Sequence, residues 1–455
     1  MRASFLAVSC TLLTLIAASG TAMGADAVQQ QDWRAGWLEA RNALIDANPR
    51  LAYDPTSLLV KFRDGADPAC IAAAKSAAGV LVEPIETWKS VPGVEHLAVD
   101  KGVRVEFAIK VLGASACVEY AEPDQVAQLA VNPNDTHFPL LWGMSNTGQT
   151  VNGDPGVANA DIDADLAWGV TTGSNLVVAV CDSGIRRSHA DLTSNIWSNP
   201  GEVAGNGIDD DGNGRVDDTW GWNFWSNNNN PVDDNGHGTH VAGTIGARGN
   251  NGAGVAGVCW NVKLASLRIA NANGSILMTA AISAVDYCRT KNIRLANHSW
   301  GGTQANATLQ TAISNARGAG HILCVAAGND NRNNDSTPYY PASYNFDNII
   351  AVGAITNDNL RASYSNFGAA SVDVFAPGTT IASCYRTNDT SYVYMSGTSM
   401  ATPHVTGVCA LVMSRYPAWT STQVRARVIS SCKAVPNLAG KCVSGGCVNA
   451  WNAVQ

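Results

Sequence analysis

From residue 131 onwards, short apolar runs alternate with longer segments of helical spacing, and this pattern constrains the fold more than any other feature. Strands that alternate with helices form a mainly parallel, doubly wound sheet with helices on both faces. The sequence therefore predicts an α/β fold for this part of the chain. We expect strands at 176–181, 263–269, 293–298, 321–327 and 349–354, and helices at 278–289, 307–319, 402–415 and 422–431.

The composition changes near residue 131, and residues 25–130 predict a separate, small α+β unit with its core at 57–126. Alternating polar and apolar residues at 57–62, 94–99 and 104–109 are typical of strands, and residues 67–78 have the pattern of a helix. Residues 131–455 then form the second, larger domain.

Residues 1–24 have the organisation of a secretory signal peptide. Arg2 precedes an apolar stretch from Phe5 to Ala18, and small residues follow around Gly24. A short buried helix is the alternative interpretation. We exclude this segment from the fold and expect a secreted protein.

The remaining composition excludes several classes of protein. Charged residues make up 15% of the 455-residue chain, and no Lys/Arg cluster suits a nucleic acid. Beyond the N-terminal segment, no apolar run approaches the roughly 20 residues that a membrane span needs. We therefore expect a globular monomer with no membrane anchor and no nucleic-acid partner.

Of the twelve cysteines, Cys10 leaves with the signal segment and Cys70 and Cys117 belong to the first unit. Secretion permits disulfides, although their connectivity cannot be deduced from the sequence. Three cysteines of the second unit lie in apolar runs and predict buried thiols: Cys181, Cys324 and Cys409. Six cysteines remain as disulfide candidates: Cys259, Cys288, Cys384, Cys432, Cys442 and Cys447. A zinc site at Cys442 and Cys447 is the alternative for the last two.

Three polar motifs coincide with ends of the predicted elements. The strand at 176–181 runs directly into Asp182, and His237 stands between two glycines at the start of a small-residue helix. Ser399 lies at the amino-terminal end of the expected helix that runs to Arg415. In parallel sheets, functional side chains collect at the carboxyl ends of strands, so we expect these residues to meet there.

These residue types suit nucleophilic catalysis. A serine hydroxyl is a weak nucleophile at neutral pH and needs an adjacent imidazole as its base. The imidazole in turn needs a buried carboxylate that fixes its tautomer and stabilises its cation. The order Asp182, His237, Ser399 is one of the three known chain orders of such a triad.

On these motifs, residues 132–452 resemble the subtilisin-like serine proteases. The resemblance implies that Ser399 is the nucleophile, that His237 is the general base and then acid, and that Asp182 orients the imidazole. It also implies that Asn329, in the segment 324–330, is the oxyanion donor together with the backbone N–H of Ser399.

The resemblance extends to the substrate. It implies that Ser299, Trp300 and Gly301 pair with an extended peptide, and that the loop 270–275 forms the opposite edge. Gly328 would line the first side-chain pocket with residues 299–301. The family often has Leu where this chain has Trp300, and a plain core position is the alternative for that residue.

An acidic loop predicts calcium. The second unit contains 21 Asp and one Glu, and five of these Asp lie between residues 209 and 218. Four positions of the loop match an EF-hand, whose alternate oxygens converge on one cation. The matching residues are Asp209, Asp211, Asn213 and Gly214, with Asp217 or Asp218 and the carbonyl of Arg215 completing the set. By resemblance, Asp191 and the loop 248–255 form a second site.

Residues 57–126 resemble the inhibitory propeptide of the same family, most clearly at 118–124. This implies a zymogen whose own propeptide is a folding aid and an inhibitor. We expect cleavage between residues 128 and 132, so that Leu129 or Ala130 occupies the first pocket.

Four other interpretations use parts of the same pattern. A catalytically idle peptide-binding module and a calcium-binding surface protein would share the architecture without the reaction. Serine-carboxyl peptidases have a similar segment around Ser399, but they use Glu and Asp where this chain has His237. A zinc pair of His237 and His240 lacks the accompanying Glu of the usual motif, which makes His240 a packing residue.

Overall fold

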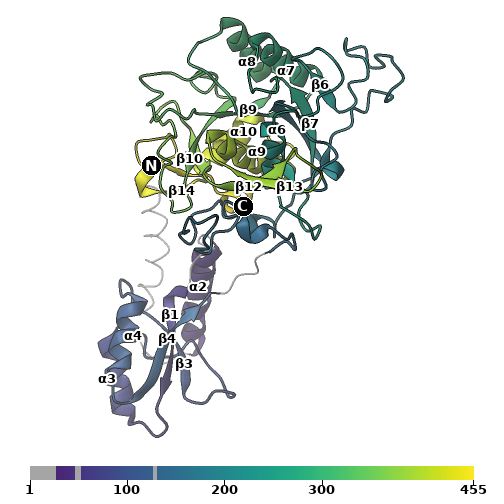
Figure 1. Cartoon of the computed structure of the whole chain (residues 1–455). Helices are drawn as coiled ribbons and strands as arrows, with labels where there is room; N and C mark the ends of the chain where they lie inside the picture. The colour runs from purple at the N-terminus through teal and green to yellow at the C-terminus, as the bar shows by residue number, and fades with distance from the viewer. Residues whose placement is uncertain (1–26, 47–52, 127–130) are drawn as a thin grey trace. The chain divides into compact units, whose positions relative to one another are not determined.

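The computed structural model describes residues 27–46, 53–126 and 131–455, and the chain divides into two compact units between Leu129 and Ala130 (Figure 1). The expected signal segment and residues 127–130 of the expected junction lie outside the described residues. Within the described ranges, no helix is both long enough and apolar enough to cross a membrane.

Among its described residues, the first unit has a four-stranded antiparallel sheet and three helices. The strand order is β2-β3-β1-β4, with β1 paired to both β3 and β4. Its core contains apolar residues of the sheet together with α3 and α4. The elements are α2 (Ala27–Asp46), β1 (Tyr53–Phe62), α3 (Pro68–Ala78), β2 (Glu86–Thr87), β3 (Val94–Ala98), α4 (Val105–Gly113) and β4 (Val118–Gln125).

The strand expected at 104–109 is wrong, because this segment belongs to α4. Val105, Ala108 and Leu112 are buried on one side of the helix, whereas Phe107 is 54% exposed. A strand would have placed Phe107 on the same face as Val105. The alternation is therefore a coincidence within a helical spacing of three and four residues.

One disulfide connects two elements of the first unit. It joins Cys70 in α3 to Cys117, which directly precedes β4, and the two residues are 47 positions apart. Closing a loop of this length restricts the unfolded chain and so stabilises the unit.

The second unit is built on a nine-stranded sheet in the order β14-β15-β11-β10-β9-β8-β5-β7-β6. All its pairings are parallel except that of β14 with β15. The doubly wound, mainly parallel sheet expected from the sequence is confirmed. Its strands are β5 (Leu176–Asp182), β6 (Gly221–Asn223), β7 (Val262–Arg268), β8 (Leu295–His298), β9 (Ile322–Ala326), β10 (Ile349–Ile355), β11 (Val374–Pro377), β14 (Lys433–Ala434) and β15 (Gly446–Cys447).

Helices cover both faces of this sheet (Figure 1). Along β5, Val178 and Val180 pack with α6 and α9, whereas Ala179 and Cys181 pack with α7 on the opposite face. This follows from the two-residue period of a strand, which sends alternate side chains to opposite faces. The remaining elements are η1 (Phe138–Leu140), α5 (Ala164–Ala167), η2 (Thr193–Asn195), α6 (His237–Gly246), α7 (Met278–Thr290), α8 (Ala307–Gly318), β12 (Ile381–Tyr385), β13 (Ser391–Met395), α9 (Thr398–Arg415), α10 (Ser421–Ser430), η3 (Pro436–Leu438) and α11 (Ala450–Val454).

The cysteines of the second unit are all free thiols, so the disulfides considered for six of them are wrong in this structure. Cys181 is buried, as expected, and Cys288 is its neighbour. Burial raises the pKa of Cys259 to about 12. The sulfurs of Cys324 and Cys409 lie 3.9 Å apart in the core. Among the described residues, no cluster of three metal-ligating side chains includes Cys442 or Cys447.

Candidate active site

Asp182 and His237 are held together where β5 ends and α6 begins. Nδ1 of His237 lies 2.8 Å from Oδ1 and 3.0 Å from Oδ2 of Asp182. The Asp182 side chain is buried, whereas 25% of the His237 side chain remains exposed. A Cβ on Gly238 would overlap the carbonyl of Gly184 and touch Asp182, so this close approach requires glycine. The carboxylate thus orients an imidazole that a substrate can reach.

Two opposing effects set the pKa of His237. Burial is the largest single effect and lowers the pKa, but the charge of Asp182, the hydrogen bond that it accepts from Nδ1 and the charge of Asp233 together raise it by more. The net result is a pKa above the ordinary histidine value. This is the effect expected of a carboxylate that stabilises an imidazolium.

Asp233 fixes the start of α6, and the sequence reasoning missed this residue. Its carboxylate accepts hydrogen bonds from the hydroxyls of Ser183 and Thr239, at 2.8 and 2.6 Å. It also accepts three backbone N–H groups of the turn that carries His237, those of Asn235, Gly236 and Thr239. The available signal was an acidic residue just before a helix start, which is typical of a cap.

Ser399 lies in the first turn of α9 and exchanges hydrogen bonds with Ser299. The Ser399 hydroxyl donates to the Ser299 carbonyl at 2.9 Å, and the Ser299 hydroxyl donates to the Ser399 carbonyl at 2.8 Å. The amide of Asn297 donates to the Ser299 hydroxyl at 2.9 Å. The structure therefore anchors Ser399 to the carboxyl end of β8.

The side chain of Asn329 has its two ends in different environments. Its oxygen accepts hydrogen bonds from the backbone N–H and the hydroxyl of Thr398, at 2.8 and 3.0 Å. A Cβ on Gly397 would lie 3.6 Å from Nδ2 of Asn329 and 3.6 Å from the backbone nitrogen of Ser399. The two nitrogen donors therefore border the same small space.

The expected substrate-binding residues follow β8 and β9. The Trp300 side chain packs against two core clusters, with its ring 5.7 Å from that of His298. Trp300 is thus a half-buried packing residue, which agrees with the core position considered as its alternative. The loop 270–275 was expected to form the opposite edge of the peptide-binding site. The N–H of Asn271 donates to the carbonyl of Ser275 at 3.0 Å and closes this loop.

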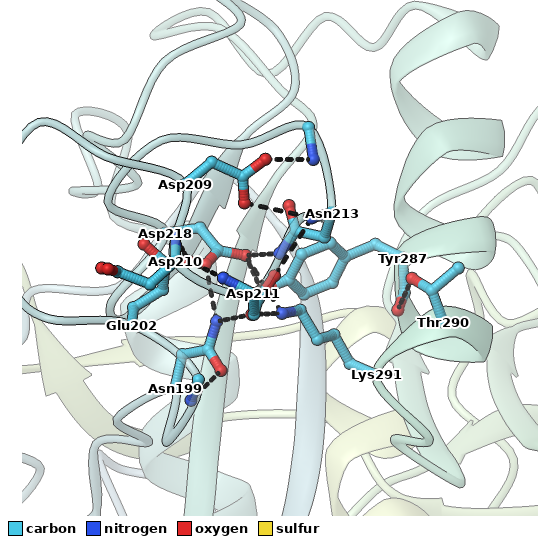
Figure 2. A network of polar contacts seen from close by, with 12 residues as sticks. Asn199, Glu202, Asp209, Asp210, Asp211, Asn213, Asp218, Tyr287, Thr290 and Lys291 are labelled. Carbon is cyan, nitrogen blue, oxygen red and sulfur yellow. Dashed lines mark hydrogen bonds and ion pairs between the residues drawn. The ribbon is translucent and has the colours of Figure 1, made fainter.

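In the acidic loop, the structure brings three carboxylates together, those of Glu202, Asp209 and Asp211 (Figure 2). Their oxygens lie within 4.8 Å of one another. Lys291 forms an ion pair with Asp211, and the amide oxygen of Asn213 is buried without a partner among the described residues. Glu202 was missed because it lies seven residues before the recognised motif.

The other predicted ligands of the loop have different environments. Asp217 accepts the backbone N–H groups of residues 205–207, and its own N–H donates to the Glu202 carboxylate at 3.1 Å. The Arg215 guanidinium lies 4.6 Å from the ring centre of Phe224. Asp218 is buried and accepts a hydrogen bond from the Tyr287 hydroxyl.

The second predicted metal site contains Asp191 and a carboxylate that the sequence reasoning missed. Asp191 accepts hydrogen bonds of 2.9 Å from Asn251, from the Val255 backbone and from the Tyr392 hydroxyl. Asp135 is buried nearby, and one of its oxygens has no partner among the described residues. Burial, together with the charge of Asp191, raises the pKa of Asp135.

A mainly parallel α/β sheet with an Asp-His pair and a helix-borne serine at its edge is the arrangement of a serine hydrolase. Residues 173–445 match the model of the subtilase family. The chain belongs to this family and is a serine endopeptidase.

Individual relatives agree with this assignment. A thermophilic serine proteinase of Bacillus sp. (strain AK1) is 34% identical over 352 residues, which are 77% of this chain and 76% of that protein. An extracellular protease of Xanthomonas campestris pv. campestris is 36% identical over 392 residues, covering 80% of this chain and 64% of its own length. A solved structure of proteases from Pseudoalteromonas arctica PAMC 21717 is 32% identical with a TM-score of 0.56, covering 71% of this chain and 98% of that one.

Proposed function

We propose that this chain is a secreted, calcium-stabilised endopeptidase made as a zymogen, in which Asp182, His237 and Ser399 carry out peptide-bond hydrolysis. The main support is the hydrogen bond between buried Asp182 and accessible His237, at the sheet edge to which Ser399 is anchored. The names of relatives, which include an extracellular protease, support secretion.

In the proposed mechanism, the Ser399 hydroxyl rotates from the Ser299 carbonyl towards His237, which removes its proton as the oxygen attacks the substrate carbonyl. Asp182 stabilises the imidazolium that forms. The substrate oxygen becomes negatively charged in the space bordered by Nδ2 of Asn329 and the N–H of Ser399. His237 then returns the proton to the leaving amine, and water hydrolyses the acyl-enzyme by the same steps.

We assign the first unit the role of propeptide. Its separation from the second unit near residue 130 is compatible with a segment that is removed. Self-cleavage between residues 128 and 132 would release the mature enzyme.

The experiment that tests this function compares the full chain with its Ser399→Ala variant by intact mass after secretion. Loss of residues up to about 131 from the wild type alone would support both the triad and the propeptide. Processing of both chains would contradict self-cleavage. If neither chain were cut and the wild type failed to react with a serine-phosphonylating reagent, the chain would be a catalytically idle binding module and not an enzyme.

Calcium fits two groups of side chains. The three carboxylates near Asn213, whose amide oxygen is buried and unpartnered, provide the hard oxygen ligands that calcium prefers. Asp135 and Asp191 form the second group, where one oxygen of Asp135 is likewise unpartnered. Calcium would neutralise these charges and stabilise the fold, without taking part in the hydrolysis.

Titration of Ca²⁺ into the full-length Ser399→Ala protein, followed by calorimetry, tests this part of the proposal. Two binding events are expected. Glu202→Gln should weaken one of them and Asp135→Asn the other, whereas exposed Asp286→Asn should change neither. Absence of calorimetric binding by the Ser399→Ala protein without further substitutions would contradict the proposal.

A further inference from the structure

Tyr339 lies against both glycines that border the expected first side-chain pocket. A Cβ on Gly328 would lie 3.1 Å from Cδ1 and from Cγ of the Tyr339 ring. A Cβ on Gly301 would lie 3.0 Å from the same Cδ1 atom and closer still to Cε1. One edge of a single aromatic ring therefore fills the space in front of both glycines.

The backbone around Tyr339 holds the ring in this position. Tyr340 and Gly302 form an antiparallel bridge, with N–H to carbonyl distances of 2.8 and 2.7 Å. The N–H of Tyr339 donates to the Ser343 hydroxyl at 3.0 Å. Burial raises the pKa of Tyr339, and the charge of Asp330 raises it further, so the phenol is neutral at ordinary pH. The backbone that carries the ring is thus held in place, and the ring is uncharged.

The position of the ring determines how much of a substrate the pocket can accept. In the proposed reaction, the side chain preceding the scissile bond enters between residues 299–301 and Gly328. A large side chain would meet the Tyr339 ring, whereas a hydrogen atom, a methyl group or a hydroxymethyl group would stop short of it. Pocket depth of this kind sets the specificity of serine proteases.

We propose that Tyr339 closes the deep part of this pocket and makes the enzyme selective for Gly, Ala or Ser immediately before the scissile bond. This inference rests on the proposed function, and it assigns a specificity residue that the sequence patterns did not indicate. It also distinguishes the two candidate residues at the propeptide junction. Ala130 fits the restricted pocket and Leu129 does not, so the mature chain begins at Val131.

The test compares kcat/KM of the mature enzyme for matched peptides with Ala, Leu or Phe before the scissile bond. We expect the wild type to prefer Ala over Phe by more than about tenfold, which is the discrimination available to a pocket that is too small. Tyr339→Ala should raise the ratio of kcat/KM for the Phe peptide to kcat/KM for the Ala peptide by about tenfold or more. Tyr339→Phe keeps the ring and should retain the wild-type ratio, so it is the matched control.

Equal cleavage of Phe and Ala peptides by the wild type would overturn the inference and leave the proposed function intact. An unchanged ratio in folded Tyr339→Ala would also overturn it. If that variant does not fold, the wild-type ratio of kcat/KM for the Ala and Phe peptides is the test of the inference. An enzyme that cleaves none of the peptides and does not react with a phosphonylating reagent would refute the proposed function, and the inference with it.

Discussion

Ser299 and Ser399 are joined by two hydrogen bonds in opposite directions, each from one hydroxyl to the other residue's backbone carbonyl, at 2.8 and 2.9 Å. The two residues are 100 positions apart, at the end of β8 and in the first turn of α9. The proposed nucleophile is therefore positioned by the strand edge that we expect to pair with the substrate.

Ser299→Ala should lower both stability and kcat. It removes the donor to the Ser399 carbonyl and leaves the buried amide of Asn297 without its acceptor. An unsatisfied buried donor costs about 1–3 kcal/mol. Urea denaturation in the Ser399→Ala background measures the free energy of unfolding without self-digestion. The exposed Ser226→Ala should leave it unchanged, and equal stability of the two variants would contradict the prediction.

Activity should rise with pH along a limb whose midpoint lies above the ordinary histidine pKa of about 6.5. His237 must be neutral to accept a proton, and the effect of Asp182 outweighs that of burial and keeps its cation to higher pH. Activity is consequently lost as the pH falls through this raised pKa. A profile of kcat/KM against pH reports it for the free enzyme. A midpoint at or below 6.5 would show that Asp182 does not control the imidazole.

Asp182→Asn should shift this limb to lower pH and reduce kcat. Without the carboxylate, burial lowers the pKa of His237, and only the smaller effect of the Asp233 charge opposes it. The equivalent change in another serine protease costs on the order of 10⁴ in kcat, a magnitude adopted here by analogy. Residual activity measured at several pH values separates the shift of the pH limb from the reduction of kcat. An unshifted limb would be inconsistent with the assigned role.

Asn329→Ala should lower kcat with little effect on KM, because its amide acts on charge that develops only in the transition state. In a subtilisin, the loss of such a donor costs about 10²–10³ in kcat. Thr398→Ser retains the hydroxyl that donates to the Asn329 oxygen and is the control for correct positioning. A change confined to KM would assign Asn329 to substrate binding instead.

Calcium chelation should lower Tm, and Asp135→Asn should reduce the size of this effect. A cation present at about one hundred times its Kd stabilises the folded state by about 2.7 kcal/mol. Asp135 has a buried oxygen without a partner among the described residues, next to the charge of Asp191. Differential scanning fluorimetry of Ser399→Ala protein with EGTA or Ca²⁺ measures the difference. An identical calcium response in Asp135→Asn would contradict the assignment.

The sequence predicted the inner strands β5, β7, β8, β9 and β10 because their residues are mostly apolar, whereas β6, β11, β14 and β15, which have two to four residues each, were not expected. The motifs around Asp182 and His237 are local, so their residues could be identified before the structure was known. Their contact could be inferred because parallel strands present their carboxyl ends at one edge. The helix bearing Ser399 begins at Thr398, four residues earlier than expected, and continues through Pro403.

Features that depend on distant contacts were not predictable. Tyr339 reaches Gly301 and Gly328 because Tyr340 bridges Gly302, and no local pattern encodes that pairing. Cys288 and Cys181 are neighbours because α7 packs on β5, although their sequence contexts gave no sign of a relationship.

β5, which ends at Asp182, lies inside the nine-stranded sheet, paired with β7 on one side and β8 on the other. The outermost strands, β6 and β14, each have one neighbour and only two or three residues. Amide hydrogens in the outer strands should exchange with solvent through local fraying, whereas those of Val178 and Val180 require opening of the whole unit. The carboxylate that orients the imidazole is therefore attached to the slowest-exchanging part of the molecule, and its position should persist while the periphery fluctuates.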